Sequence, residues 1–295
     1  MSKALVLGGK SGLLGQALVK VLNERDWEVQ SFGRQDGDLS DPDYVERLLG
    51  EANADAVFNS LAWTRVDDAE NHQNEADKAN RILPSILAKA MARLGHGFLA
   101  HFSTDFVFPG DSTIPYPENA PPDPKNVYGS TKLAGEKAVL AALPERSCVI
   151  RTAWLFGPGR KNFITSILDA CNKRDMISVV DDQIGSPTYS LDLALWSTIL
   201  AEKKAAGIWN GVNSGHASWC EFAAEAVALV RGPCKVEPIP SAQWPQKAIR
   251  PPYSVLNNEK LAAVIGKKPR PWPQALRDYI FGYILPDKED NLEKH

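Results

Sequence analysis

The sequence predicts an α/β protein: a doubly wound parallel sheet followed by a smaller, mixed α/β domain. Apolar strand-like segments alternate with amphipathic helical segments from the N-terminus to about Gly159. This is the pattern of a parallel sheet that helices cover on both faces. A glycine-rich turn joins the first strand to the first helix, as in nucleotide-binding sheets of the Rossmann type. After Gly159 the alternation loosens and the strand-like runs shorten. We therefore expect a nucleotide-binding domain at residues 1–160 and a second domain at 161–295.

The individual elements follow from hydrophobic spacing. Runs of branched and aromatic residues predict strands, and apolar residues that recur every three or four positions predict helices. In the first domain the expected strands are 3–9, 28–33, 54–62, 97–108 and 147–157. The expected helices are 13–24, one from about Pro42, a long one over 74–95 with an internal Pro84, and the one that contains Tyr128. The second domain has expected helices at 162–173, 190–203, 218–231 and 273–281, and short strands at 177–183, 207–212 and 234–240.

Composition argues against several classes of function. The formal net charge is −3 and the isoelectric point is about 6.0, so the chain has no strong positive field to attract nucleic acid or an anionic membrane. No apolar run approaches the roughly 18 residues that span a bilayer, and the N-terminus starts as a strand, without a signal-peptide pattern. The four cysteines and five histidines are scattered. We expect reduced thiols, no metal site and a cytoplasmic location.

The glycine-rich turn is the first candidate site. "VLGGKSGLLGQAL" spaces Gly9, Gly12 and Gly15 three residues apart between a strand and a helix. Glycine allows the tight turn and lets the backbone approach a pyrophosphate, which then rests on the helix N-terminus. A glycine-rich turn without a ligand is the alternative, but the flanking strand and helix favour a dinucleotide site. The expected cofactor contacts are Gly9, Gly12, Leu13, Leu14 and Gly15.

The end of the second strand selects between cofactors. A carboxylate there would bind the ribose 2′-hydroxyl of NAD(H), whereas an arginine can accept the 2′-phosphate of NADP(H). The strand ends in Ser31-Phe32-Gly33-Arg34, with no acid until Asp36. Arg34 therefore favours NADPH, with NADH as the second cofactor, although a solvated surface arginine remains the alternative. Asp38 and Leu39 are placed to hold the adenine, and Ala62 would let the backbone lie close to the cofactor.

A phenol and an ammonium group lie one helical turn apart in "NVYGSTKLAGEKAV". Tyr128 and Lys132 are at i, i+4, a spacing that also occurs in ordinary surface pairs. The preceding strand ends in Ser103, Thr104 and Asp105, at the edge of the sheet where ligands bind. A free tyrosine has a pKa near 10, and a neighbouring ammonium together with the positive nicotinamide of an oxidised cofactor would lower it. The combination predicts a proton donor, a partner that lowers its pKa, and a threonine hydroxyl in one pocket.

Six segments together carry a family resemblance. "GGKSGLLG", "STDFVFPGD" and "NVYGSTKLAGEKAV" resemble the extended short-chain dehydrogenase/reductases. "RTAWLFGPGRKNFITSIL", "VVDDQIGSPTYSLDLA" and "RPPYSVLNNEKL" are similar to the dTDP-4-dehydrorhamnose reductase family within them. The resemblance implies NAD(P)H-dependent reduction of the C4 ketone of a nucleotide-activated 6-deoxy-4-keto sugar. It also implies that a segment near 185–215 returns to the first domain, and that 161–295 is mainly substrate-binding.

The resemblance carries roles to individual positions. Tyr128 would be the general acid, Lys132 would also hold the nicotinamide ribose, and Thr104 would bind the sugar O4. Gly9, Gly12 and Gly15 would cradle the pyrophosphate. Arg250 is a candidate partner for the substrate diphosphate, with a structural salt bridge as the alternative. The expected substrate contacts are Val66, Ser103, Thr104, Asp105, Phe106, Trp154 and Arg250.

Two departures from the family pattern affect the predictions. Phe106 stands where members usually carry tyrosine, so one hydroxyl contact to the sugar is missing and the exact sugar stays open. Some members dimerise through magnesium held by glutamates, and this chain has Gln16 and the segment 190–192 at those places. We expect a monomer or weak homodimer without a magnesium bridge.

Two other functions fit the same fold. A nucleotide-binding regulatory subunit, such as the beta subunit of methionine adenosyltransferase, would need no proton relay, so the presence of Thr104, Tyr128 and Lys132 argues against it. An epimerase or dehydratase of the same superfamily would keep its cofactor through the reaction. The segments "STDFVFPGD" and "DDQIGSPT" resemble the reductases more closely.

Overall fold

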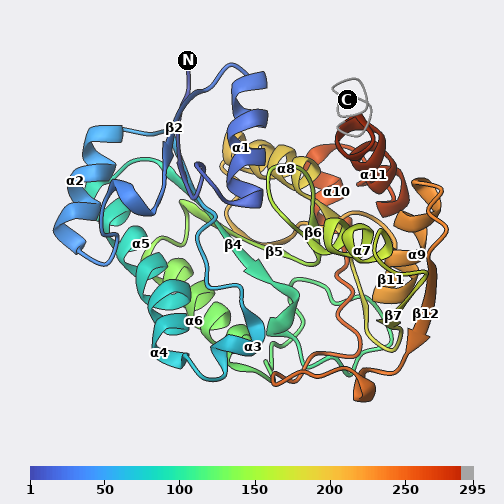
Figure 1. Cartoon of the computed structure of the whole chain (residues 1–295). Coiled ribbons are helices and arrows are strands. Elements are labelled where there is room, and N and C mark those ends of the chain that lie inside the picture. The colour runs from blue at the N-terminus through green and yellow to red at the C-terminus, as the bar shows by residue number, and fades with distance from the viewer. Residues whose placement is uncertain (287–295) are drawn as a thin grey trace.

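The computed structural model describes residues 1–286 and shows a parallel sheet as the centre of the molecule (Figure 1). The six-stranded sheet of the described residues has the order β10-β5-β4-β3-β1-β2, with every neighbouring pair parallel. The predicted doubly wound α/β fold is therefore confirmed. The strand bounds are β1 Lys3–Leu7, β2 Glu28–Phe32, β3 Ala56–Asn59, β4 Phe98–Thr104, β5 Ser147–Thr152 and β10 Gly207–Asn210.

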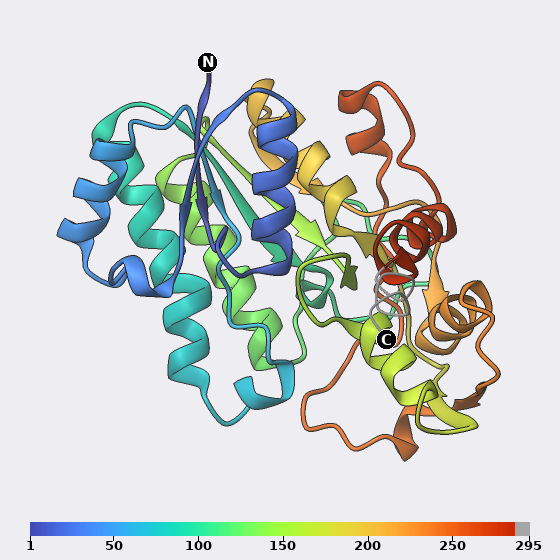
Figure 2. The ribbon, with the colours of Figure 1, turned by 45° about the horizontal axis from the view of Figure 1, so that its top comes forward.

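Helices cover both faces of this sheet (Figures 1 and 2). On one face α1 (Leu13–Glu24) and α8 (Ser190–Glu202) bury their apolar side chains against the strands. On the other face lie α2 (Pro42–Ala52), α5 (Leu83–Leu94) and α6 (Val127–Ala142). Because both faces are covered, every residue of β3, β4 and β5 is buried.

The long helix predicted over 74–95 differs from a regular α-helix. The structure has α4 (Gln73–Asp77), a π-helical turn (Lys78–Ile82) and then α5. Pro84 lacks an N–H and its ring crowds the carbonyl four residues earlier, so the chain widens locally before it. The wider turn directs the buried Asn80 side chain inward. There its Nδ2 donates to the Thr131 hydroxyl of α6 at 3.1 Å and its Oδ1 accepts from the Trp63 N–H at 2.9 Å.

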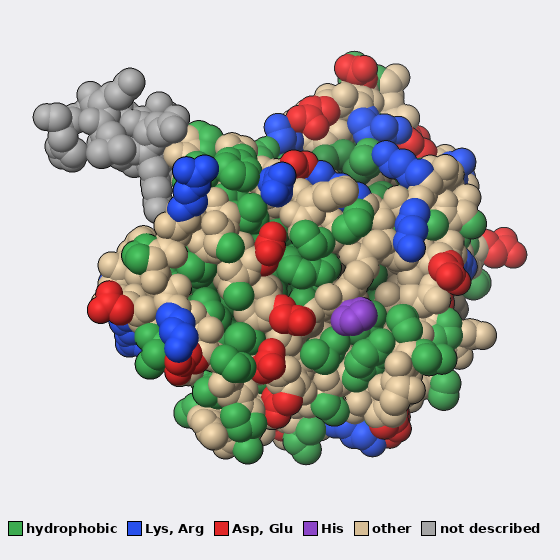
Figure 3. All heavy atoms as spheres, turned by 90° about the vertical axis from the view of Figure 1, so that its right-hand side faces the viewer, with side chains coloured by type: hydrophobic (Ala, Val, Ile, Leu, Met, Phe, Trp, Pro, Cys, Tyr) green, Lys and Arg blue, Asp and Glu red, His purple; other side chains and the backbone are tan. Residues whose placement is uncertain are grey.

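The second half of the chain packs around its own apolar cluster. The cluster joins α7 (Phe163–Cys171), α9 (Trp219–Leu229) and α11 (Trp272–Tyr279) to the parallel pair β7 (Met176–Val180) and β12 (Lys235–Ile239). Figure 3 shows acidic, basic and apolar side chains interspersed on this face of the molecule. The smaller elements are α3 Val66–Ala69, β6 Leu155–Phe156, β8 Ile184–Gly185, β9 Thr188–Tyr189, β11 Ala217–Ser218 and α10 Glu259–Ile265.

Two of the later elements lie on the first half of the molecule. The strand β10 forms an edge of the six-stranded sheet beside β5, and α8 packs against α1. No helix within residues 1–286 is long and apolar enough to cross a membrane.

Candidate functional site

The candidate site lies where β4 ends and α6 begins. Strand β4 delivers Ser103 and Thr104, and a 3₁₀-helix, Asp105–Val107, follows at once. The observed strand β4, Phe98–Thr104, is thus shorter than the predicted strand 97–108. The reason is local, because the Thr104 hydroxyl accepts from the Phe106 N–H at 3.2 Å and turns the chain. Helix α6 begins after Asn126, whose side chain accepts from the Gly129 N–H at 2.7 Å.

Thr104, Asp105, Phe106 and Tyr128 meet at this point. The Thr104 hydroxyl donates to Asp105 Oδ1 at 3.0 Å and lies close enough to the Tyr128 hydroxyl to influence its pKa. The Phe106 ring meets the Tyr128 ring edge-on, with centroids 5.8 Å apart. Ser103 and Asp105 are buried, and Ser103 Oγ and Asp105 Oδ2 have no hydrogen-bond partner among the described residues. Buried polar atoms of this kind suit a site that a polar ligand completes.

The pKa of Tyr128 moves in the opposite direction to our expectation. Its pKa is raised to about 12: burial is the main cause, Thr104 lowers the pKa in part, and the charge of Asp105 adds a smaller increase. Lys132 is not among the causes of this shift, and desolvation of the phenolate is the largest of them. At neutral pH Tyr128 is therefore a phenol, which is the protonation state that a general acid requires.

Lys132 lies one turn further along α6 and is buried. Its Nζ donates to the Phe102 carbonyl of β4. Burial lowers the pKa of Lys132 to about 8, and the charge of Glu136 partly opposes this. Glu136 forms an ion pair with Arg151 of β5, with 2.8 Å between Oε2 and Nη2 and both side chains 2% exposed.

The sequence analysis did not identify Glu136 and Arg151 as neighbours of Lys132. The i, i+4 spacing from Lys132 to Glu136 could have indicated that these two side chains lie close together. His101 is fully buried on β4 with Nδ1 3.2 Å from Asn59 Nδ2. Burial, and then the charge of Lys132, hold the pKa of His101 well below its usual value, so the ring is neutral.

The glycine turn has the geometry of a pyrophosphate cradle. The Gly12 N–H donates to the Gly8 carbonyl at 2.9 Å, and Gly12 caps α1 without a side-chain hydrogen bond. A Cβ atom on Gly15 would lie 2.1 Å from the Gly8 carbonyl oxygen, so only glycine permits this close packing of turn and helix. Leu13 and Leu14 form the first turn of α1, where backbone N–H groups have no intrahelical acceptor. The residues present therefore fit a dinucleotide.

The end of β2 places the remaining cofactor candidates. Arg34 opens a 3₁₀-helix, but its side chain lies outside what the structure describes. Asp36 is already paired, with its Oδ1 2.5 Å from Lys10 Nζ and its Oδ2 2.6 Å from the Gly33 nitrogen. Asp38 Oδ1 accepts from both the N–H and the hydroxyl of Ser40. The buried Leu39 side chain packs into the core, and Ala62 lies in the loop after β3.

The other substrate candidates lie on elements around the site. Val66 begins α3. Trp154 follows β5 with a φ of +46° and stacks on Trp219 at a centroid distance of 3.5 Å. The guanidinium of Arg250 forms a two-pronged contact with Asp67, with Nη2 2.6 Å from Oδ2 and Nη1 3.0 Å from Oδ1. Arg250 thus makes the structural ion pair that sequence reasoning left as its alternative.

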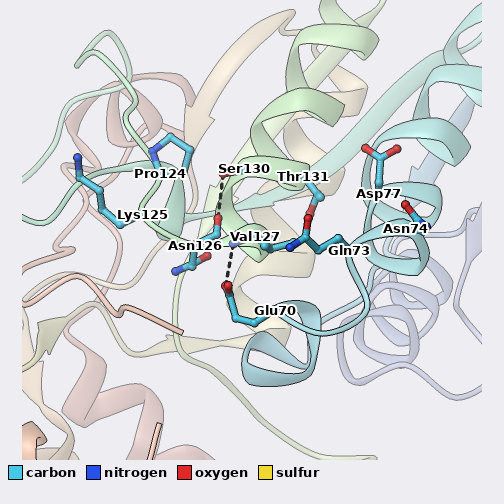
Figure 4. Close-up of a pocket in the computed structure, with 10 residues that line it drawn as sticks. All are labelled: Glu70, Gln73, Asn74, Asp77, Pro124, Lys125, Asn126, Val127, Ser130 and Thr131. Atoms are coloured by element: carbon cyan, nitrogen blue, oxygen red, sulfur yellow. Dashed lines mark hydrogen bonds between the residues drawn. The ribbon is translucent and has the colours of Figure 1, made fainter. Parts of the chain in front are cut away.

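A pocket of about 620 Å³ lies beside the first turn of α6, outside this constellation (Figure 4). The side chain of Glu70 reaches α6 from the other wall and accepts from the Val127 N–H at 2.9 Å, while the Ser130 hydroxyl donates to the Asn126 carbonyl. These bonds stabilise the beginning of the helix that carries Tyr128. The pocket is lined by Glu70, Gln73, Asn74, Asp77, Pro124, Lys125, Asn126, Val127, Ser130 and Thr131.

Comparisons with known proteins agree with this geometry. A model of the RmlD substrate binding domain family matches residues 2–284. The chain is 38% identical to a dTDP-4-dehydrorhamnose reductase of Streptomyces griseus, over 92% of this chain and 90% of that one. It is 37% identical to a probable dTDP-4,6-dihydroxy-2-methyloxan-3-one 4-ketoreductase of Streptomyces antibioticus, over 92% and 93% of the two chains.

A solved structure shares the whole fold. The dTDP-4-dehydrorhamnose reductase of Bacillus anthracis, determined in complex with NADP, has a TM-score of 0.91 and 30% identity, and the match covers 96% of this chain and 100% of that one. The resemblance seen in the sequence motifs is thereby confirmed. This chain belongs to the dTDP-4-dehydrorhamnose reductase family.

Proposed function

We propose that this protein is an NADPH-preferring reductase that converts dTDP-4-dehydro-L-rhamnose to dTDP-L-rhamnose, with NADH as a second cofactor. The observation that carries the proposal is the contact of Thr104, Asp105 and Tyr128 at the end of β4, with Lys132 one turn along α6. A phenol that is protonated at neutral pH is suited to deliver a proton to the oxygen of a ketone.

The proposed roles divide the reaction between these side chains. NADPH, when bound, supplies the hydride to C4. Tyr128 donates the proton to O4, and the Thr104 hydroxyl orients that oxygen through a hydrogen bond. The buried ammonium of Lys132 holds the nicotinamide ribose and favours the phenolate that Tyr128 becomes after proton transfer. Gly9, Gly12, Leu13, Leu14 and Gly15 hold the pyrophosphate, Arg34 the 2′-phosphate, and Asp38, Leu39 and Ala62 the adenosine and the cleft wall.

The substrate contacts are part of the same proposal. Residues 161–295, apart from about 185–215, form most of the sugar-nucleotide site, together with Val66, Ser103, Asp105, Phe106 and Trp154 from the first half. Phe106 presents an apolar ring where a hydroxyl would otherwise reach the sugar. The Streptomyces antibioticus relative is named for a different keto sugar, so a sugar other than dehydrorhamnose is the second candidate substrate.

The remaining proposals concern assembly and compartment. We infer a monomer or weak homodimer without bridging magnesium. The Asp192 carboxylate is bound by Arg270 and by Asn213, each at 2.7 Å, and Gln16 contributes an amide in place of a carboxylate. The four cysteines are free thiols, which suits a reducing cytoplasm.

The decisive experiment is oxidation of NADPH and of NADH with enzymatically prepared dTDP-4-dehydro-L-rhamnose, with the product identified by NMR. We expect rapid turnover to dTDP-L-rhamnose and a higher kcat/KM for NADPH. Tight binding of NADPH without turnover of this sugar would contradict the substrate assignment and direct the assay to the other keto sugars.

A further inference from the structure

Asp67 of α3 is bound by a segment that follows it by about 180 residues. Its Oδ1 accepts from the Lys247 and Ala248 N–H groups at 2.9 and 3.0 Å. The same carboxylate accepts from Arg250 Nη1 and Nη2 at 3.0 and 2.6 Å. One carboxylate thus receives four hydrogen bonds from three residues of the second half of the chain. In Figures 1 and 2 this orange segment runs beside α3.

The segment 241–254, which we call the strap, is anchored at both ends. Near its start, the Ser241 N–H and hydroxyl donate to the Asp182 carboxylate. Near its end, the Ile184 N–H donates to the Pro252 carbonyl and the Ser254 N–H to the Ile184 carbonyl, each at 2.8 Å. Asp67 therefore joins the middle of the strap to the nucleotide-binding half.

The strap also touches the elements that carry the candidate site. Asn126, the residue that caps α6, donates from Nδ2 to the Ile249 carbonyl at 2.8 Å. The buried Ser254 side chain lies close enough to Asp105 to lower its pKa. The strap residues that bind Asp67, which directly follows Val66, lie on either side of Ile249. The strap therefore borders the region where Asp105, Tyr128 and Val66 would meet a substrate.

We call the contacts of Asp67 with Lys247, Ala248 and Arg250 the clasp. Its chemistry allows it to open. The side chains of Arg250 and Asp67 are 22% and 39% exposed, so both charges return to water when the contact opens. The two-pronged geometry and the backbone donors nevertheless favour the ionised carboxylate strongly. Their effect is visible in Asp67, whose pKa is held well below its usual value, chiefly by the Arg250 hydrogen bonds.

The arrangement also changes the role assigned to Arg250. Its Nη1 donates to Gln246 Oε1 at 3.2 Å and to the Ala248 carbonyl at 3.3 Å, in addition to Asp67. Because Nη1 is bound within the strap and both Nη groups are bound by Asp67, the guanidinium acts on the substrate through the position of the strap.

We propose that Asp67 is a positioning residue: through Arg250 and the Lys247 and Ala248 N–H groups it holds the strap against α3, and the held strap forms one wall of the sugar-nucleotide site. The inference rests on the proposed function, because it assigns the strap to the nucleotide-sugar substrate. The cofactor would be held by the glycine turn, so we expect its binding not to depend on these contacts of Asp67.

The test is Asp67→Asn, which keeps the size of the side chain and removes the charge that binds Arg250. We expect KM for the keto sugar and the Kd of dTDP, measured by calorimetry, to rise about 10-fold or more. We expect kcat to change less than about threefold, and the Kd of NADPH to stay within about twofold, since the proton donor and the glycine turn are untouched. Trypsin should cut after the exposed Lys247 faster than in the wild type, with dTDP slowing the cut.

The matched control is Asp68→Asn. Asp68 is the next residue, is exposed, and pairs with Arg65 at 3.2 Å instead of with the strap. We expect its KM, dTDP affinity and trypsin cleavage to match the wild type. If Asp67→Asn fails to fold, as judged by circular dichroism, the charge-swapped double variant Asp67→Arg with Arg250→Asp replaces it. That variant should regain dTDP affinity relative to Arg250→Asp alone.

The outcomes separate the two proposals. Unchanged KM and dTDP affinity in Asp67→Asn would overturn the proposal that Asp67 positions the strap at the sugar-nucleotide site, even if trypsin cleavage rises. A fall in kcat alone would overturn it as well. A wild type that does not turn over the keto sugar would overturn the proposed function, and the dTDP titration would then still decide on Asp67. A wild type that binds no dTDP would overturn both.

Discussion

Glu136 and Arg151 form an ion pair between α6 and β5 in which both side chains are 2% exposed. Glu136 Oε1 and Oε2 accept from Arg151 Nε and Nη2 at 3.0 and 2.8 Å. The guanidinium of Arg151 makes two further contacts. Its Nη1 donates to the Glu118 carbonyl at 3.0 Å, and the group lies over the Phe108 ring. The pair therefore places a fully satisfied negative charge one turn from Lys132.

Breaking this pair should destabilise the fold strongly. Glu136→Gln leaves the Arg151 charge buried without a counter-charge, which typically costs about 3–5 kcal/mol. Urea unfolding followed by circular dichroism measures the change in the free energy of unfolding. As a control, Glu46→Gln removes an exposed partner of Arg93 and should cost less than about 1 kcal/mol. Equal effects of the two variants would contradict the argument from burial.

The buried, charged Lys132 should lower the stability of the folded protein. Burial lowers its pKa from 10.5 to about 8, so below pH 8 the folded state holds a charge that burial disfavours by about 3 kcal/mol at most. Lys132→Met should abolish turnover and raise Tm at pH 7. Between pH 8 and 10.5 the wild type loses this proton on folding and gains stability as pH rises. The advantage of Lys132→Met should therefore shrink across that window, and an advantage that grows with pH would contradict the assignment.

Tyr128→Phe tests the general acid. Removal of the hydroxyl should lower kcat about 100-fold or more, as expected when a general acid is removed. The Kd of NADPH, measured by fluorescence titration, should change little. Tyr283→Phe removes a hydroxyl far along the chain, in the turn after α11, and serves as the control for the substitution itself. Full turnover by Tyr128→Phe would remove Tyr128 from its role.

Asp105 should control the upper pH limit of the reaction. Burial raises the pKa of Asp105 to about 6, so the group is ionised at neutral pH and its charge raises the pKa of Tyr128. Asp105→Asn should shift the alkaline limb of the kcat profile to lower pH. Stability gives a second reading: since the folded pKa is raised, the wild type loses stability as pH rises from 3.8 through 6, and Asp105→Asn should not. Asp123→Asn, an exposed acid paired with Lys125, should leave both profiles unchanged.

Arg34→Ala tests the choice of cofactor. If Arg34 accepts the 2′-phosphate, its removal should weaken NADPH about 10-fold or more and leave NADH nearly unchanged, since NADH lacks that phosphate. Titration of both cofactors against the same variant measures the ratio directly. Arg93→Ala, which removes an exposed arginine on α5, is the control. An equal loss of affinity for the two cofactors would contradict the proposed preference.

The sequence by itself determined the parallel sheet, the glycine turn and the Tyr128–Lys132 pair. Each is encoded locally: continuous apolar strands, three glycines between a strand and a helix, and an i, i+4 spacing on one helix face. The same local signals located Thr104 and Asp105, because a strand in a parallel sheet delivers its last residues to the ligand-binding edge.

Only the tertiary structure decided the contacts and charges around these groups. Asp67 and Arg250 are 183 positions apart, and no local pattern marks them as partners. The π-helical turn that points Asn80 at Thr131 arises from Pro84 and from packing against α6. The pKa of Tyr128 rises where the sequence suggested a fall, because desolvation depends on the whole surrounding fold, while residue spacing records only which charges are near along the chain.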